Sequence, residues 1–173
     1  MEAVRFREAR VDDAREIAAL INSCYRGDSS RVGWTTEADL LDGTRTNEFE
    51  VESLITTPGS MMLLCVEDKE IIGSVHLQHE GSSAYLGMLV VKPALQGGGL
   101  GRRLMEAAER LVRERWNVGK VTMTVFTVRS ELLAYYERRG YRRTGRAKRF
   151  EAHAVHGTPR VEGLELEVLE KDL

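Results

Sequence analysis

Cysteine is scarce in this sequence, and long apolar runs are missing from it. The 173 residues include two cysteines, Cys24 and Cys65, which lie far apart and outside any CxxC spacing. This pattern predicts reduced, partly buried thiols rather than a disulfide framework. No apolar run approaches the roughly eighteen residues that span a bilayer, and the N-terminal MEAVRFREAR lacks the apolar stretch of a signal peptide. We therefore expect a cytoplasmic protein without a membrane-spanning segment.

The sequence also lacks a large excess of charge of either sign. The formal net charge is -2, which argues against a general nucleic-acid binder. Basic residues cluster between positions 138 and 149, and the simplest interpretation of this cluster is a solvated face. The composition is 42% apolar and 30% charged, and the length suits one sizeable core. We expect a single domain over residues 1–173.

Hydrophobic periodicity predicts strands and helices in a mixed order. The expected strands cover 4–9, 61–66, 71–77, 85–91, 121–127, 141–146 and 164–170. The expected helices begin after Asp13, after a capping box at Thr36 and Asp39, and around 47–57, 100–116 and 130–140. The three strands between 61 and 91 follow one another through short turns, so they should pair antiparallel.

A glycine-rich turn precedes the longest expected helix, in the stretch QGGGLGRRLMEAAERL that begins at Gln96. Glycines before a helix let backbone N–H groups approach an anion where the helix N-terminus carries partial positive charge. The stretch lacks the Gly-Lys-Ser/Thr ending of a P-loop, and Arg102 occupies the last glycine position of a dinucleotide fingerprint. What remains is Q-x-x-G-x-G, formed by Gln96, Gly99 and Gly101. A phosphate site and a flexible turn both remain compatible with these residues taken alone.

Two motifs together resemble the GNAT superfamily of N-acetyltransferases. LVVKPALQGGGLG, from Leu89 to Gly101, is similar to the family's strand, V-x-P and Q/R-x-x-G-x-G/A, and AYYERRGY, from Ala134 to Tyr141, is similar to its LYEKxGF helix. The order of the expected elements along the whole chain also matches that family. The resemblance implies a mixed α+β fold with a central, mostly antiparallel, seven-stranded sheet that is splayed at the cofactor site and flanked by about four helices.

The resemblance implies acetyl-coenzyme A as cosubstrate. Its pyrophosphate would lie on the amides of the turn and its pantetheine along the strand before it, which would leave backbone groups for an extended ligand to complete. The implied cofactor-binding residues are Leu89, Val90, Val91, Gln96, Gly97, Gly98, Gly99, Leu100, Gly101 and Arg102. Arg129 is a further candidate, at the position where the family has an asparagine that contacts the cofactor.

Acetyl transfer needs a neutral amine and a proton for the departing thiolate. By the resemblance, Tyr136 is the general acid, with core filling as the alternative, and its neighbour Tyr135 is expected to serve packing. Many family members carry a catalytic glutamate at positions that hold Tyr85 and Thr124 here, and neither residue is a conventional base. The base is therefore open between a water chain and the candidates Glu48, Glu50, His76 and His79.

A metal or a covalent intermediate is not expected. His76 and His79 are three residues apart on an expected strand, so they face opposite sides, and no cysteine lies near the pair His153 and His156. Cys65 lies in the middle of an expected strand without an adjacent histidine, so we do not expect it to carry an acyl group.

We interpret the chain as an acetyl-coenzyme A-dependent N-acetyltransferase that acts on a small-molecule or peptide amine by direct transfer in a ternary complex. The alternative is a non-catalytic module that senses acyl-coenzyme A. The acceptor site should be built largely from residues 25–58, because loops in this part of such folds vary most freely. We expect neither nucleic acid nor membrane as a partner, and a homodimer remains open.

Overall fold

A computed structural model describes residues 3–25, 41–42, 44–150, 158–160 and 163–173. The strands are β1 (Arg5–Glu8), β2 (Leu41–Asp42), β3 (Ser60–Glu67), β4 (Glu70–Glu80), β5 (Ser83–Val91), β6 (Lys120–Phe126), β7 (Arg142–Arg149), β8 (Thr158–Pro159) and β9 (Glu165–Asp172). The helices are α1 (Ala14–Tyr25), α2 (Glu48–Thr56), α3 (Leu100–Trp116) and α4 (Ser130–Arg138), with 3₁₀ turns η1 (Val11–Asp13) and η3 (Pro93–Leu95).

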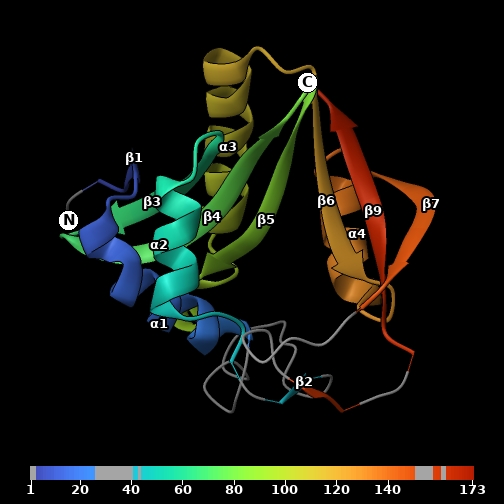
Figure 1. Ribbon diagram of the computed structural model, residues 1–173, viewed down its shortest axis with the longest axis horizontal. Coiled ribbons are helices and arrows are strands. Elements are labelled where there is room, and N and C mark those ends of the chain that lie inside the picture. The colour runs from blue at the N-terminus through green and yellow to red at the C-terminus, as the bar shows by residue number, and fades with distance from the viewer. Residues whose placement is uncertain (1–2, 26–40, 43, 151–157, 161–162) are drawn as a thin grey trace.

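Seven of these strands form one sheet in the order β1-β3-β4-β5-β6-β9-β7. All neighbours are antiparallel except β5 and β6, which pair in parallel. The two halves of the sheet diverge between β5 and β6, and helices cover both faces (Figure 1). The expectation of a mixed α+β fold with a splayed seven-stranded sheet and four helices is confirmed.

Strand β3 shows why the central strands read as continuous apolar runs. Its alternate residues Met61, Leu63 and Cys65 belong to the core under α3 and α4, whereas Met62, Leu64 and Val66 belong to the core under α1 and α2. Side chains of a strand alternate between faces, so a strand covered on both faces must be apolar throughout. The turn to β4 uses Asp68 and Lys69, both with positive φ (48° and 70°), which suits a tight hairpin.

The divergence of β5 from β6 has two visible causes. The parallel ladder contains only three pairs and ends at Tyr85 opposite Thr122. The pairing of β5 with β4 then shifts register between Ser74 and His76, and Met88 adopts a positive φ of 50°. A bulge of this kind bends a strand and increases its twist. The last part of β5, from Leu86 to Val91, therefore lacks a strand partner on its β6 side.

Helix α3 follows from an amphipathic pattern with distinct ends. Leu104, Ala108 and Val112 are buried at helical spacing, and Arg and Glu residues occupy the outer face. Gly99 caps the start and Asn117 the end, both in the left-handed conformation, and Arg113 and Arg115 lie in the last turn. The observed bounds of α3 match the sequence-based expectation.

Some expectations concern parts of the chain that lie outside the described residues, among them the short helix with its capping box at Thr36 and Asp39. Strand β9 enters the sheet between β6 and β7 rather than following β7 at the edge, a placement that periodicity did not predict. Among the described helices, none is long and apolar enough to cross a membrane.

Candidate active site

The glycine-rich turn links η3 to α3 and leaves open space around its backbone. Gly97 and Gly99 have positive φ values of 88° and 83°, a region that L side chains rarely adopt. A Cβ atom at either position would meet no protein atom within 4 Å. Space beside the first amides of a helix is what an anion requires.

Gly101 differs from its neighbours because it lies against another helix. A Cβ atom there would be 3.1 Å from the hydroxyl of Tyr135, which comes from α4. The guanidinium carbon of Arg139 lies 4.2 Å from the centre of the Tyr135 ring. Tyr135 is thus fixed between the glycine turn and an arginine, which sequence analysis did not foresee when it assigned this residue to packing.

A cavity of about 440 Å³ runs from the end of β5 to the start of α3. It is lined by Cys24, Tyr25, Leu89, Val90, Val91, Gln96, Gly97, Gly99, Gly101, Arg102, Arg129, Leu132, Tyr135, Tyr136, Arg138 and Arg139. The predicted cofactor residues are brought together here, except for Gly98 and Leu100, which do not line the cavity. Arg102, Arg138 and Arg139 add positive charge beside the glycine turn, so the cavity suits a ligand with phosphate groups.

Side chains from α1 and the turn contact the backbone at the end of β5. The Tyr25 hydroxyl donates to the Leu89 carbonyl at 3.1 Å, and the Cys24 thiol donates to the Val91 carbonyl at 3.2 Å. The Gln96 side-chain amide donates to the same Val91 carbonyl at 3.1 Å. These bonds position the splayed end of β5 at the rim of the cavity.

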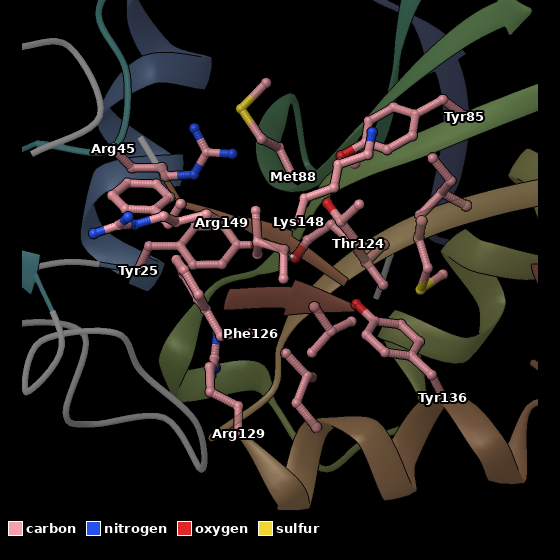
Figure 2. Close-up of a pocket in the computed structure, with 18 residues that line it drawn as sticks. Tyr25, Arg45, Tyr85, Met88, Thr124, Phe126, Arg129, Tyr136, Lys148 and Arg149 are labelled. Atoms are coloured by element: carbon pink, nitrogen blue, oxygen red, sulfur yellow. Dashed lines mark hydrogen bonds between the residues drawn. The ribbon is translucent and has the colours of Figure 1, made fainter. Parts of the chain in front are cut away.

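A second cavity of about 310 Å³ lies on the other side of this rim (Figure 2). Its lining comprises Tyr25, Arg45, Tyr85, Leu86, Gly87, Met88, Leu89, Met123, Thr124, Val125, Phe126, Arg129, Leu132, Tyr136, Lys148, Arg149, Phe150 and Leu166. Tyr25, Leu89, Arg129, Leu132 and Tyr136 line both cavities. These five residues form the boundary at which a ligand in one cavity would meet a ligand in the other.

Tyr136 lies at this boundary. It is 6% exposed, and Figure 2 shows it rising from α4 with its hydroxyl directed into the second cavity. Burial raises the pKa of the Tyr136 phenol above its ordinary value, so the group keeps its proton at neutral pH. Its ring packs edge-to-face between Tyr135 and Tyr141, which fixes its orientation.

The chain was also compared with known proteins. The profile of the acetyltransferase (GNAT) domain matches residues 42–159, more than half of the sequence. This protein belongs to the GNAT acetyltransferase family. Members of this family transfer an acyl group from acetyl-coenzyme A. No curated protein matches the sequence significantly.

Solved GNAT structures share the fold at low sequence identity. A GNAT acetyltransferase from Streptococcus pneumoniae is 20% identical, with 99% of this chain and 100% of that chain covered and a TM-score of 0.69. A ribosomal-protein-alanine N-acetyltransferase from Brucella melitensis is 19% identical, with coverages of 98% and 99% and a TM-score of 0.71. A spermidine N-acetyltransferase chimera from Vibrio cholerae is 18% identical, with coverages of 99% and 96% and a TM-score of 0.69.

The two positions at which many GNAT enzymes carry a glutamate are in contact here. The Tyr85 hydroxyl lies 3.2 Å from the Thr124 hydroxyl, and both residues line the second cavity. The two side chains come from β5 and β6, so their contact lies where these strands begin to diverge. The second cavity therefore presents hydroxyl groups at both positions.

The four candidate bases lie outside both cavities. Glu48 pairs with Arg15 at 3.4 Å, and Glu50 lies on the same short helix, whose first turn is capped by Asn47. Both residues belong to α2, and neither is among the residues that line the cavities.

Neither histidine lines a cavity, although the His76 ring packs edge-to-face against the cavity residue Tyr85, with ring centres 6.4 Å apart. The His76 ring lies 2.9 Å from the Ser60 hydroxyl, and burial lowers its pKa to about 4. The His79 ring stacks on Trp116 at 5.2 Å and contacts the Gly81 carbonyl at 2.8 Å. The described residues contain no group of three or more His, Cys, Asp or Glu that could hold a metal ion.

Both thiols are buried and reduced, and burial raises the pKa of each to about 11. Cys24 is the one that lines the cofactor cavity, where its thiol donates to Val91. A thiol with so high a pKa is a poor nucleophile at neutral pH. The expectation of direct transfer without an acyl-cysteine stays a prediction.

Sequence analysis missed several residues of the site. Tyr25, Arg45, Arg138, Lys148 and Arg149 line one or both cavities. The last three belong to the basic cluster that we interpreted as a solvated face; all three are exposed, as that interpretation requires, and they also line a cavity. From residues 25–58, the described part of the chain contributes Tyr25 and Arg45, so most of the described acceptor-side wall comes from β5, β6 and β7.

Proposed function

We propose that this GNAT protein transfers the acetyl group of acetyl-coenzyme A to a primary amine by direct attack in a ternary complex. One observation carries the proposal: two adjoining cavities share five lining residues. The first cavity, beside the glycine turn, would hold the acetyl donor and is called the cofactor cavity. The second would hold the amine and is called the acceptor cavity. A donor and an acceptor in these cavities would meet at the shared boundary. Bringing two reactants together in this way removes much of the entropic barrier of a bimolecular reaction.

The cofactor side would be held by two kinds of contact. The open amides of the turn at Gly97–Gly99 and the start of α3 would accept the pyrophosphate, with Arg102, Arg138 and Arg139 nearby. The unpaired edge of β5 from Leu89 to Val91 would contact the extended pantetheine. The residues present therefore fit the cosubstrate that the family uses.

Tyr136 would act as the general acid. It lies at the shared boundary and retains its proton, which it would deliver to the departing thiolate as the thioester bond breaks. Thr124 contributes a second hydroxyl group to the lining of the acceptor cavity. Proton return to Tyr136 from solvent would complete the cycle.

The amine would lose its proton without a conventional base. Among the described residues that line the acceptor cavity, none is Asp, Glu or His, while Arg45, Arg129, Lys148 and Arg149 are cationic. Nearby positive charge disfavours the protonated form of an amine and lowers its pKa. This electrostatic effect raises the neutral fraction of the bound acceptor, and water at the Tyr85 and Thr124 hydroxyls would carry the proton to solvent.

Solved relatives agree with an amine acceptor but differ in its nature. The solved relatives include an acetyltransferase of spermidine and an acetyltransferase of ribosomal-protein alanine. These acceptors all present an amine, which is the part that acetyl transfer requires. For this chain we propose an amine acceptor on the same ground.

The test separates an enzyme from a sensor. Coenzyme A release is followed with a thiol reagent across a broad amine panel, and acetyl-coenzyme A binding is measured in parallel by calorimetry. Release that depends on both the amine and the protein supports transfer. Binding without release for any amine would favour an acyl-coenzyme A sensor, which the missing carboxylates would also allow.

A further inference from the structure

Strand β7 carries two groups of basic residues with different environments. Arg142, Arg143 and Arg146 each pair with a carboxylate on β9, at 2.6 Å to Glu170, 2.7 Å to Glu167 and 3.3 Å to Glu170. Lys148 and Arg149, at the end of the same strand, line the acceptor cavity. No carboxylate of the described residues lies within ion-pair distance of either.

Arg45, which precedes α2 in the sequence, contributes a third cation to the lining of this cavity. Arg45 lies 5.8 Å from the centre of the Tyr25 ring, and its backbone N–H is bonded to Asn22. Within the described ranges its guanidinium also has no carboxylate partner. In Figure 2, Arg45 and Arg149 lie at the end of the cavity away from Tyr85 and Tyr136.

The rest of the lining, as far as the structure describes it, is mostly apolar and contains no carboxylate. Met88, Met123, Phe126, Phe150 and Leu166 contribute apolar surface. The lining residues that the structure describes include no Asp or Glu, so several cations face about 310 Å³ with no internal counterion. A volume of this size suits a small molecule rather than a folded partner.

We propose that the acceptor is a small amine that also carries a carboxylate, with Arg149 and Arg45 as the residues that select it. This inference rests on the proposed acetyltransferase function and names its substrate class. The carboxylate would form charge-assisted hydrogen bonds at the cationic end, and the amine would lie at the boundary near Tyr136. A polyamine such as spermidine would be repelled by the same charges.

The test uses acceptors that differ in charge alone. Phenylalanine is compared with its amide and with phenethylamine, and glycine, β-alanine and 4-aminobutyrate vary the distance between amine and carboxylate. Each kcat/KM is corrected for the fraction of neutral amine at the assay pH, because the amides are less basic than the acids. Spermidine is the cationic control.

We expect at least one carboxylate-bearing acceptor to exceed its uncharged analogue by roughly tenfold or more in corrected kcat/KM. Arg149→Met and Arg45→Met should each reduce this preference several-fold, chiefly through the KM of the carboxylate-bearing acceptors. Arg146→Met removes the same charge from the same strand outside both cavities, so it should keep the preference.

The outcomes separate the two proposals. Acetylation of uncharged amines or spermidine in preference to every carboxylate-bearing acceptor would overturn this inference and leave the acetyltransferase function in place. Equal losses in Arg146→Met and Arg149→Met would also overturn it, because the effect would then be general electrostatics. If no amine is acetylated, the proposed function itself fails. In that case, calorimetric binding of N-acetylphenylalanine but not N-acetylphenethylamine to the coenzyme A complex would still support carboxylate recognition.

Discussion

The phenolic oxygen of Tyr85 lies 3.2 Å from the hydroxyl oxygen of Thr124, across the point where β5 and β6 separate. By the family resemblance, a glutamate is expected at one of these two positions, and here both hold hydroxyl groups. The acceptor cavity thus contains hydroxyl groups and cations where a carboxylate base would be expected. Any mechanism that removes the proton from the acceptor amine has to work with these hydroxyl groups and cations.

The first prediction concerns the pH dependence of wild-type activity. kcat/KM reports the free enzyme and free substrate, so it should rise about tenfold per pH unit from pH 7 toward an amine pKa near 10. The sign follows from the neutral amine as the reactive form, whose fraction grows as protons are removed. Initial rates at low acceptor concentration between pH 6.5 and 9.5 check this. A profile that levels off near pH 7 would indicate a conventional base that the described lining does not contain.

The second prediction removes both hydroxyls in Tyr85→Phe/Thr124→Val. We expect kcat/KM at pH 7 to fall roughly tenfold, below the contribution of a directly positioned base, because the water that carries the proton loses its partners. The deficit should shrink as the pH approaches the amine pKa, where no proton has to be moved. Rates of both proteins across the same pH range give the comparison, and a deficit that stays constant with pH would contradict the relay.

The third prediction tests Tyr136 as the acid. Tyr136→Phe keeps the ring and should preserve acetyl-coenzyme A affinity while turnover falls about 10²- to 10⁴-fold. Tyr141→Phe is the matched control, since Tyr141 is also a buried phenol but lies outside both cavities, where its hydroxyl is 3.5 Å from Glu109. Tyr135 is unsuitable as a control because it lines the cofactor cavity. Unchanged turnover in Tyr136→Phe would assign this residue to core filling.

The fourth prediction concerns the glycine turn. Acetyl-coenzyme A at about a hundredfold its Kd should raise the thermal midpoint by roughly 5–10 °C. Gly101→Val should lose most of this shift, because its side chain would enter the cavity beside the Tyr135 hydroxyl. Gly98→Ala should keep the shift, since a Cβ there has its nearest contact at 3.7 Å and Gly98 lies outside the cavity lining. Calorimetric scans with and without the ligand measure both; a full shift in Gly101→Val would remove Gly101 from the site.

The fifth prediction follows from the buried His76. Its pKa is about 4 in the folded protein and near 6.5 when unfolded, so the unfolded state alone binds a proton between these values. The free energy of unfolding should therefore fall as the pH drops from about 6.5 to 4, by on the order of 3 kcal/mol from this group, and the effect is absent above pH 6.5.

The variant His76→Gln should lack this component of acid sensitivity, whereas His79→Gln, at an exposed position, should retain it. Urea unfolding at closely spaced pH values measures the slope in each protein. Equal slopes in His76→Gln and the wild type would contradict the assigned pKa. Carboxylates elsewhere contribute equally to all three proteins, so they cancel in the comparison.

Local sequence determined which segments form helices and strands, and it determined the position of the glycine turn before α3. The bounds of α3 match the expectation, and the hairpin of β3 and β4 and the helix α2 also appear where periodicity predicted them. These features depend on contacts between residues close in the chain, such as the Asn47 side chain with the Glu50 N–H. The motif from Leu89 to Gly101 likewise carries its geometry within a short segment.

The tertiary structure alone decided which residues face each cavity. Strand β9 lies between β6 and β7, and the register of β7 against it shifts between Arg143 and Ala147. This arrangement gives Arg142 and Arg143 carboxylate partners and leaves Lys148 and Arg149 at the acceptor cavity, although all four belong to one basic run. A charge pattern along a strand shows the residue types but not the neighbours, because the neighbours come from strands paired over long sequence separations.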